Sequence, residues 1–312
     1  MQKDRFILTG SSHEICQDFG LYDSFINVHG EEVGYAIISD GCSSSPNTDI
    51  GSRVLVLSAQ DVVRNIGESF PDADTLISNI MTTALSRLAS LLDINYWRLL
   101  NDPDVYNEEF SYLDATLTIL LYMEDISYIF QYGDGCVLLY KDDNSKVFIE
   151  FESARATNGQ PIPPYPIYFA NCDKSYKRRL RYMAEVGSQP ILRRTMYIIN
   201  GDEITKSIEN YSSYRLFNFP TPNVAMITTD GLQSFYVKGT NAPVDSLSVA
   251  QNVLNLKGLN GKFVQKRLKR MTREYVSAGI FNYDDITVAG ISAGEDSNDQ
   301  NNAVRTNNIE LC

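Results

Sequence analysis

Short apolar runs separated by turn residues dominate the first part of the chain. FILTG (6–10), YDSFINVHG (22–30) and VGYAIISDG (33–41) are rich in β-branched and aromatic residues, a composition that favours β-strands. The apolar residues between positions 54 and 66 then recur at roughly helical spacing, which predicts a helix with Asp49 as its N-cap.

A second helix is expected to begin near Asp72, with Asp72 or Asp74 as N-cap, and to run through ADTLISNIMTTALSRLASLL. Strand patterns then return in four runs joined by short turns, at 114–123, 126–133, 136–141 and 146–151. Such short connections join antiparallel neighbours, and the Asp-Gly pair at 134–135 is a hairpin signal by itself.

The second half of the chain is harder to interpret. Residues 152–190 contain the proline-rich run GQPIPPYPIY, which excludes regular structure there and indicates an insertion or flap. Further strands are expected at 195–200, 223–229 and 285–291, and helices at 247–256 and 261–279. Helices grouped between antiparallel runs indicate an α+β fold, a four-layer α-β-β-α sandwich of two packed antiparallel sheets with helices on the outer faces.

The expected domain organisation follows from this pattern. Residues 1–291 should form one domain, in which 152–222 is rich in insertions, and residues 292–312 are polar enough to form a disordered tail.

Charge and cysteine content narrow the possible partners. The net charge of −12 argues against nucleic acid and anionic membranes. The basic stretches 174–181 and 266–270 are interpreted as solvated helix faces. Five cysteines without paired spacing indicate reduced thiols, and no apolar run reaches the roughly 20 residues of a membrane helix. We therefore expect a cytoplasmic protein, as a monomer.

Four aspartates stand at the ends of apolar runs, each beside a glycine or a second aspartate: Asp40, Asp134, Asp230 and Asp284. Antiparallel pairing can bring all four to one edge of the sandwich. Clustered carboxylates repel one another unless cations neutralise them, and oxygen ligands favour Mg²⁺ or Mn²⁺ over Zn²⁺. Each aspartate also fits a role as a cap or turn former, and the hairpin alone would explain Asp134.

Six segments resemble, in order, the motifs of the metal-dependent Ser/Thr protein phosphatases of type 2C, bacterial branch. They are GSSHEICQD (10–18), ISDGCSSSPNTDIGSR (38–53), DATLTILL (114–121), QYGDGCVLLY (131–140), TTDGL (228–232) and DDITVAGI (284–291). The resemblance implies hydrolysis of phosphoserine and phosphothreonine in proteins, by a water that two Mn²⁺ or Mg²⁺ ions activate.

The resemblance also implies a set of metal ligands: Asp18, Asp40, Gly41, Asp134, Asp230 and Asp284. Asp40 would bridge both ions and Gly41 would offer its backbone carbonyl. Asp134 would help to hold a third, weaker ion. Asp40 and Asp230 are also assigned as catalytic, together with His13.

Three positions depart from the family pattern. His13 stands where many members have a phosphate-binding arginine; it would contact phosphate, donate a proton to the leaving group, or be an ordinary surface residue. Cys42 replaces a histidine of animal members, and Asp285 replaces an asparagine. In addition, SSSPNTD (43–49) replaces the Gly-Gly that follows the family's Asp-Gly motif. The lost arginine at His13 and this altered loop motivate the alternative function, a pseudophosphatase that serves as a regulatory binding module. Action on a small phosphorylated metabolite also stays open.

Overall fold

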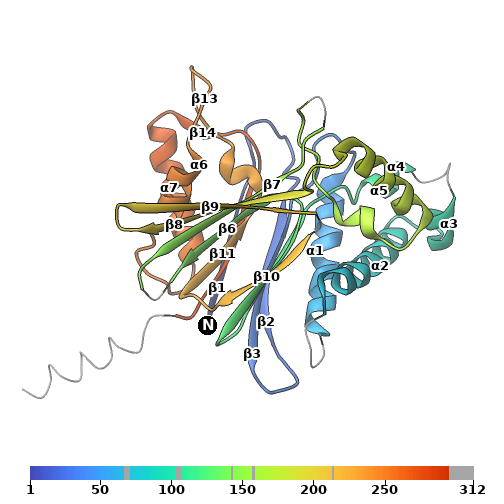
Figure 1. The fold of residues 1–312 in the computed structure, drawn as a ribbon, viewed down its shortest axis with the longest axis horizontal. Coiled ribbons are helices and arrows are strands. Elements are labelled where there is room, and N and C mark those ends of the chain that lie inside the picture. Colours follow the sequence, from blue (N-terminus) through green and yellow to red (C-terminus); the bar gives the residue numbers. More distant parts are fainter. Residues whose placement is uncertain (67–70, 103–106, 142, 157–158, 213, 295–312) are drawn as a thin grey trace, which may run out of the picture.

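Two antiparallel sheets packed face to face form the centre of the molecule (Figure 1). The computed structural model describes residues 1–66, 71–102, 107–141, 143–156, 159–212 and 214–294. The larger sheet has the order β1 (Gln2–Leu8), β15 (Ile286–Ser292), β11 (Val224–Thr228), β6 (Gly135–Tyr140), β7 (Lys146–Ser153), β8 (Leu192–Asn200), β9 (Glu203–Tyr211). The smaller sheet has the order β10 (Arg215–Pro220), β5 (Ile126–Tyr132), β4 (Leu117–Tyr122), β3 (Glu32–Ser39), β2 (Phe19–Ile26).

Helices cover the outer face of each sheet (Figure 1). On the smaller sheet lie α1 (Thr48–Arg64) and α2 (Ala73–Leu91), and on the larger sheet lie α6 (Ser246–Val253) and α7 (Phe263–Ser277). The four-layer α-β-β-α sandwich expected from the sequence is therefore confirmed.

Three apolar layers hold these elements together. Along β3, Ile37 packs in the core beneath α1 and α2, whereas the next residue, Ile38, packs between the sheets. On the other sheet, Leu138 faces α6 and α7 and Val137 faces the first sheet. Because central strands are covered on both faces, they are apolar throughout and not alternating.

The N-caps of α1 and α2 can be compared with the predicted ones. Asp72 is the N-cap of α2, and its side chain accepts a hydrogen bond from Thr75 N, as predicted. The prediction for α1 was wrong. Asn47 occupies the cap with a φ of 52° and makes no side-chain cap bond, while Asp49 lies inside the first turn. There its charge still favours the positive end of the helix dipole.

Several elements were not anticipated. Residues 152–190 are not wholly irregular, since they contain the 3-10 helix η1 (Pro166–Phe169) and the helix α5 (Asp173–Val186). The strands β9 and β10 were not predicted either. The other unpredicted elements are α3 (Tyr96–Asn101), α4 (Asn107–Ser111), η2 (Asp230–Gln233), and a small sheet of β13 (Ala242–Pro243), β12 (Phe235–Val237) and β14 (Ile280–Asn282).

The proposed division of the chain stays a prediction. The final strand extends to Ser292, and residues 295–312 of the expected tail lie outside the described residues. Within the described part of the chain, no helix is both long enough and apolar enough to cross a membrane.

Candidate active site

Five aspartates from distant parts of the sequence meet where strands of both sheets end. Asp18 precedes β2, Asp40 follows β3, Asp134 lies in the turn from β5 to β6, Asp230 opens η2 after β11, and Asp284 lies between β14 and β15. The structure thus gathers every predicted carboxylate at one edge of the sandwich.

Their electrostatic interactions show how closely they lie. Burial raises the pKa of Asp40 well above its usual range, and the neighbouring carboxylates of Asp18 and Asp230 raise it further. Burial likewise raises the pKa of Asp18 to about 7, and the pKa of Asp134 to about 7, with Asp230 adding to the effect on both. The pKa of Asp284 is raised too, first by burial and then by Asp230.

Two of these carboxylates carry oxygens that fit a divalent cation. Asp18 Oδ2 accepts a hydrogen bond of 2.7 Å from Thr229 Oγ1. Asp18 Oδ1 and Asp230 Oδ1 are buried and have no hydrogen-bond partner among the described residues. Unpartnered buried oxygens beside like charges are costly, and hard oxygen donors are what Mg²⁺ and Mn²⁺ take as ligands. The donor set therefore fits these ions.

His13 lies against the same site and is not an ordinary surface histidine. Its Nδ1 is 3.0 Å from Asp285 Oδ2 and 3.5 Å from Asp284 Oδ1, and its side chain is 17% exposed. These three residues place one potential ligand atom each within 4.8 Å of one another. The imidazole is thus held at the rim of the carboxylate cluster.

Asp285 anchors the segment that carries His13, a role that the sequence did not reveal. Its buried carboxylate accepts hydrogen bonds from Gly10 N at 2.7 Å and from Gln17 N at 2.6 Å. In the sequence, Asp285 stands out only because it replaces the family's asparagine. With both oxygens engaged by backbone N–H groups, Asp285 positions the segment that leads into Asp18.

Two glycines allow the backbone around Asp284 to pack tightly. A Cβ at Gly231 would lie 1.7 Å from Asp285 O, and a Cβ at Gly10 would lie 2.4 Å from Tyr283 O. Any larger residue would have to displace the chain between β14 and β15. The Asp-Gly motif at 230–231 is therefore needed for close approach as well as for its carboxylate.

The loop after Asp40 is fixed from the opposite side by an ion pair. Arg178 of α5 donates hydrogen bonds to both carboxylate oxygens of Asp114, with Nη1–Oδ1 at 2.5 Å. Ser45 Oγ also donates to Asp114 Oδ2, and Cys42 N donates to Asp114 O at 2.9 Å. The interpretation of residues 174–181 as a purely solvated helix face was therefore wrong for Arg178.

Gly41 and Cys42 lie inside this loop. Gly41 forms an isolated antiparallel bridge with Ala115, so its backbone is held in register with the DATLTILL strand. Cys42 Sγ lies 3.1 Å from Ser44 Oγ. The four described cysteines, Cys16, Cys42, Cys136 and Cys172, form no disulfide.

An apolar cavity of about 450 Å³ lies beside the segment that follows η2. Its lining includes Gln233 and Ser234, which follow Asp230, and the aromatic side chains of Tyr236 and Tyr283. Tyr283 is 60% exposed and directly precedes Asp284. The cavity is therefore lined by residues from the two segments that carry Asp230 and Asp284.

Comparison with known proteins agrees with the motifs. The family model described as protein phosphatase 2C matches residues 9–271. The chain therefore belongs to the protein phosphatase 2C family, and the resemblance stated from the motifs is confirmed. A search of curated protein sequences finds no match.

Solved structures with similar folds come from bacterial phosphatases. A bacterial serine phosphatase is 13% identical with a TM-score of 0.47, and the match covers 95% of this chain and 99% of that one. Stp1 from Staphylococcus aureus is 13% identical, with a TM-score of 0.45 and coverage of 94% and 95%. The catalytic domain of PstP, in complex with two manganese ions, is 12% identical, with a TM-score of 0.45 and coverage of 93% and 96%. At such scores these similarities add no argument of their own.

Proposed function

We propose that this protein hydrolyses phosphoserine and phosphothreonine in protein substrates with the help of Mn²⁺ or Mg²⁺. The observation that carries the proposal is the cluster of five aspartates, two of which have a buried oxygen with no hydrogen-bond partner in the described part of the chain. Membership of the protein phosphatase 2C family supports the reaction type. A scaffold that only binds partners has no physical reason to keep these mutually repelling charges together.

Each residue of the site has a defined task in this proposal. Asp40 would bridge two ions. Asp18 and Gly41 would complete the ligands of one of these ions, and Asp230 and Asp284 those of the other. Asp134, together with Asp230, would support a weaker third ion. When bound, such ions polarise phosphoryl oxygens and lower the pKa of a coordinated water.

The remaining polar groups orient these ligands. Thr229 donates to Asp18 and fixes the carboxylate plane, and such supporting contacts set ligand geometry. Asp285 holds His13 at the rim, where its imidazole can contact the phosphate or protonate the leaving group. Catalytic roles for Asp40, Asp230 and His13 belong to the proposal.

The apolar cavity beside η2 favours a protein substrate over a small metabolite. Its volume of about 450 Å³ and its tyrosine lining suit an amino-acid side chain next to the phosphorylated residue. Tyr283→Ala should raise KM for a phosphothreonine peptide several-fold and leave hydrolysis of p-nitrophenyl phosphate unchanged. The matched control is Tyr96→Ala, at a tyrosine on α3 that is 39% exposed. Equal effects on both substrates would favour a small-molecule phosphatase.

The decisive experiment measures hydrolysis of both substrates with Mn²⁺, with Mg²⁺ and after metal removal. Asp230→Asn should abolish activity while the circular dichroism spectrum stays native. Asp93→Asn, the same change at an exposed residue with a φ of 53°, should keep full activity. A folded protein without activity under any metal would instead support the regulatory binding module.

The proposal places the protein in the cytoplasm as a monomer that acts on phosphorylated proteins. The unpaired cysteines fit a reducing compartment. Size-exclusion chromatography with light scattering would test the monomer, and a dimer mass would contradict it.

A further inference from the structure

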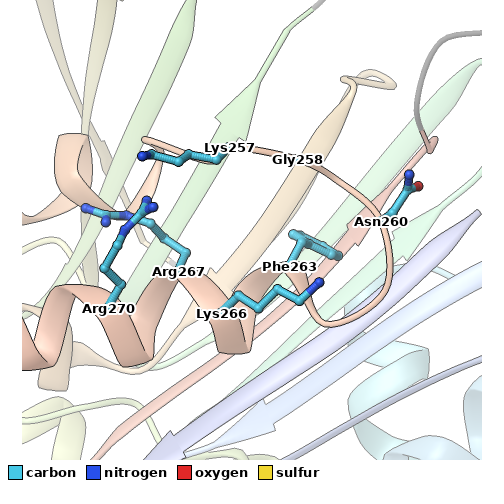
Figure 2. Close-up of a pocket in the computed structure, with 7 residues that line it drawn as sticks. All are labelled: Lys257, Gly258, Asn260, Phe263, Lys266, Arg267 and Arg270. Atoms are coloured by element: carbon cyan, nitrogen blue, oxygen red, sulfur yellow. The ribbon is translucent and has the colours of Figure 1, made fainter.

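A compact basic pocket lies between α7 and the loop that precedes it (Figure 2). It encloses about 290 Å³. Among the described residues that line it, none is acidic and four are cationic: Lys257, Lys266, Arg267 and Arg270. Such a concentration of positive charge stands out in a chain with a net charge of −12.

The pocket lies at the opposite end of the larger sheet from the candidate active site. Asp284 and Asp285 precede the first residue of β15, whereas Ser292, its last residue, donates to Leu259 O in the pocket loop. Gly261 N donates to Gln2, which pairs with Ser292. The strand alone separates the two ends by about 20 Å, so an anion in this pocket would not touch the aspartates.

Arg267 shows that the pocket is more than a solvated helix face. Its side chain is only 4% exposed, which corrects the interpretation of the basic stretch 266–270. Nε donates to Asn252 O, and Nη2 lies 3.4 Å from Asn252 Oδ1. Nη1 faces a carboxylate oxygen of Glu274 at 3.8 Å, beyond hydrogen-bond distance.

The cationic groups converge instead of spreading into solvent. Figure 2 shows the nitrogen-bearing ends of Lys257, Arg267 and Arg270 pointing toward one another, whereas Lys266 points away from them. Burial, and then the charge of Arg270, lower the pKa of Arg267. Glu274 lies 3.8 Å from Arg270 as well. Its carboxylate offsets one of the three positive charges of Lys257, Arg267 and Arg270.

We propose that this pocket binds a small phosphate-bearing anion, with the diphosphate group as its recognised chemistry. Planar guanidinium groups form paired hydrogen bonds with phosphate oxygens, and a lysine adds a point charge. A diphosphate can neutralise the three converging cations, and the pocket volume of about 290 Å³ admits that group. The ligand is therefore inorganic pyrophosphate or the terminal diphosphate of a nucleotide.

The test uses the full chain, freed of metal with a chelating resin, so that the outcome does not depend on the proposed phosphatase activity. Isothermal titration calorimetry at low salt measures binding of pyrophosphate, of adenosine diphosphate and of citrate. Lys257→Ala and Arg270→Ala should each weaken diphosphate binding at least tenfold. Lys269→Ala, which removes an exposed charge from the same helix outside the pocket, should leave it unchanged.

The comparison of ligands decides whether the bound diphosphate is inorganic or part of a nucleotide, and whether the pocket selects phosphate over carboxylate. Tighter binding of adenosine diphosphate would identify a nucleotide, and tighter binding of pyrophosphate the inorganic anion; either result supports the proposal if the two pocket variants are impaired. Three results would overturn it: no binding at millimolar ligand, equal losses in Lys269→Ala, or citrate binding as tightly as pyrophosphate with the same sensitivity to the variants.

Discussion

Asp285→Ala should loosen the segment from Gly10 to Gln17 and weaken metal binding at the same time. The carboxylate accepts two backbone hydrogen bonds, of 2.7 Å and 2.6 Å. A hydrogen bond to a charged group contributes about 1.5–3 kcal/mol. Because both bonds share one carboxylate, their losses are not additive, and about 3 kcal/mol is expected for the pair.

This loss translates into a measurable melting shift. Unfolding entropy of about 2.1 cal/mol/K per residue gives roughly 0.65 kcal/mol/K for 312 residues. The thermal midpoint should therefore fall by about 4–5 °C. Asp285→Asn keeps one acceptor and should lose about half as much. Asp93→Asn provides the control for a change of charge alone.

The functional readout separates positioning from bulk stability. The anchored segment carries His13 and leads into Asp18, so the apparent affinity for Mn²⁺ should fall about tenfold or more, measured well below the melting range. A thermal midpoint within about 1 °C of the parent, together with an unchanged Mn²⁺ dependence, would refute the assigned role of Asp285.

Three further predictions follow from the same contacts. In metal-free protein, the pKa values of Asp18 and Asp134 are raised to about 7 from 3.8, so the folded chain holds more protons than the unfolded chain between about pH 4 and 7. Stability should then fall as pH rises across this range; a thermal midpoint that rises from pH 5 to pH 8 would contradict this. Arg178→Leu leaves Asp114 buried without its cation and should lower the urea midpoint by an amount equivalent to about 3 kcal/mol or more; an unchanged midpoint would argue against the ion pair. Gly231→Ala should reduce activity at least tenfold in a folded protein, because its Cβ would lie 1.7 Å from a carbonyl oxygen; parental kinetics would show that the backbone relaxes freely.

The strand ends at the site could be predicted because two sequence signals coincide at each of them. Each apolar run is long enough to indicate a buried strand, and each begins or stops at a polar Asp-Gly or Asp-Asp pair. Antiparallel geometry then brings these ends to one edge without further information.

Other contacts left no such mark in the sequence. The ion pair between Arg178 and Asp114 spans 64 residues, and nothing local distinguishes that arginine from its solvated neighbours. Strand β9 is exposed along nearly its whole length, so it shows no alternation toward a core. Helix α5 buries few apolar side chains, among them Tyr182 and Val186, and its strongly polar composition hides the apolar face.

The pairing of β1 with β15, from Gln2 with Ser292 to Leu8 with Ile286, has a consequence for synthesis. A ribosome delivers residues in order, and domains fold as their parts emerge. Here β1 lacks its partner in the larger sheet until β15 has left the exit tunnel. Asp18 and Asp285 come together only once β15 is in place, so the nascent chain would remain without this site until it has been made through Ser292.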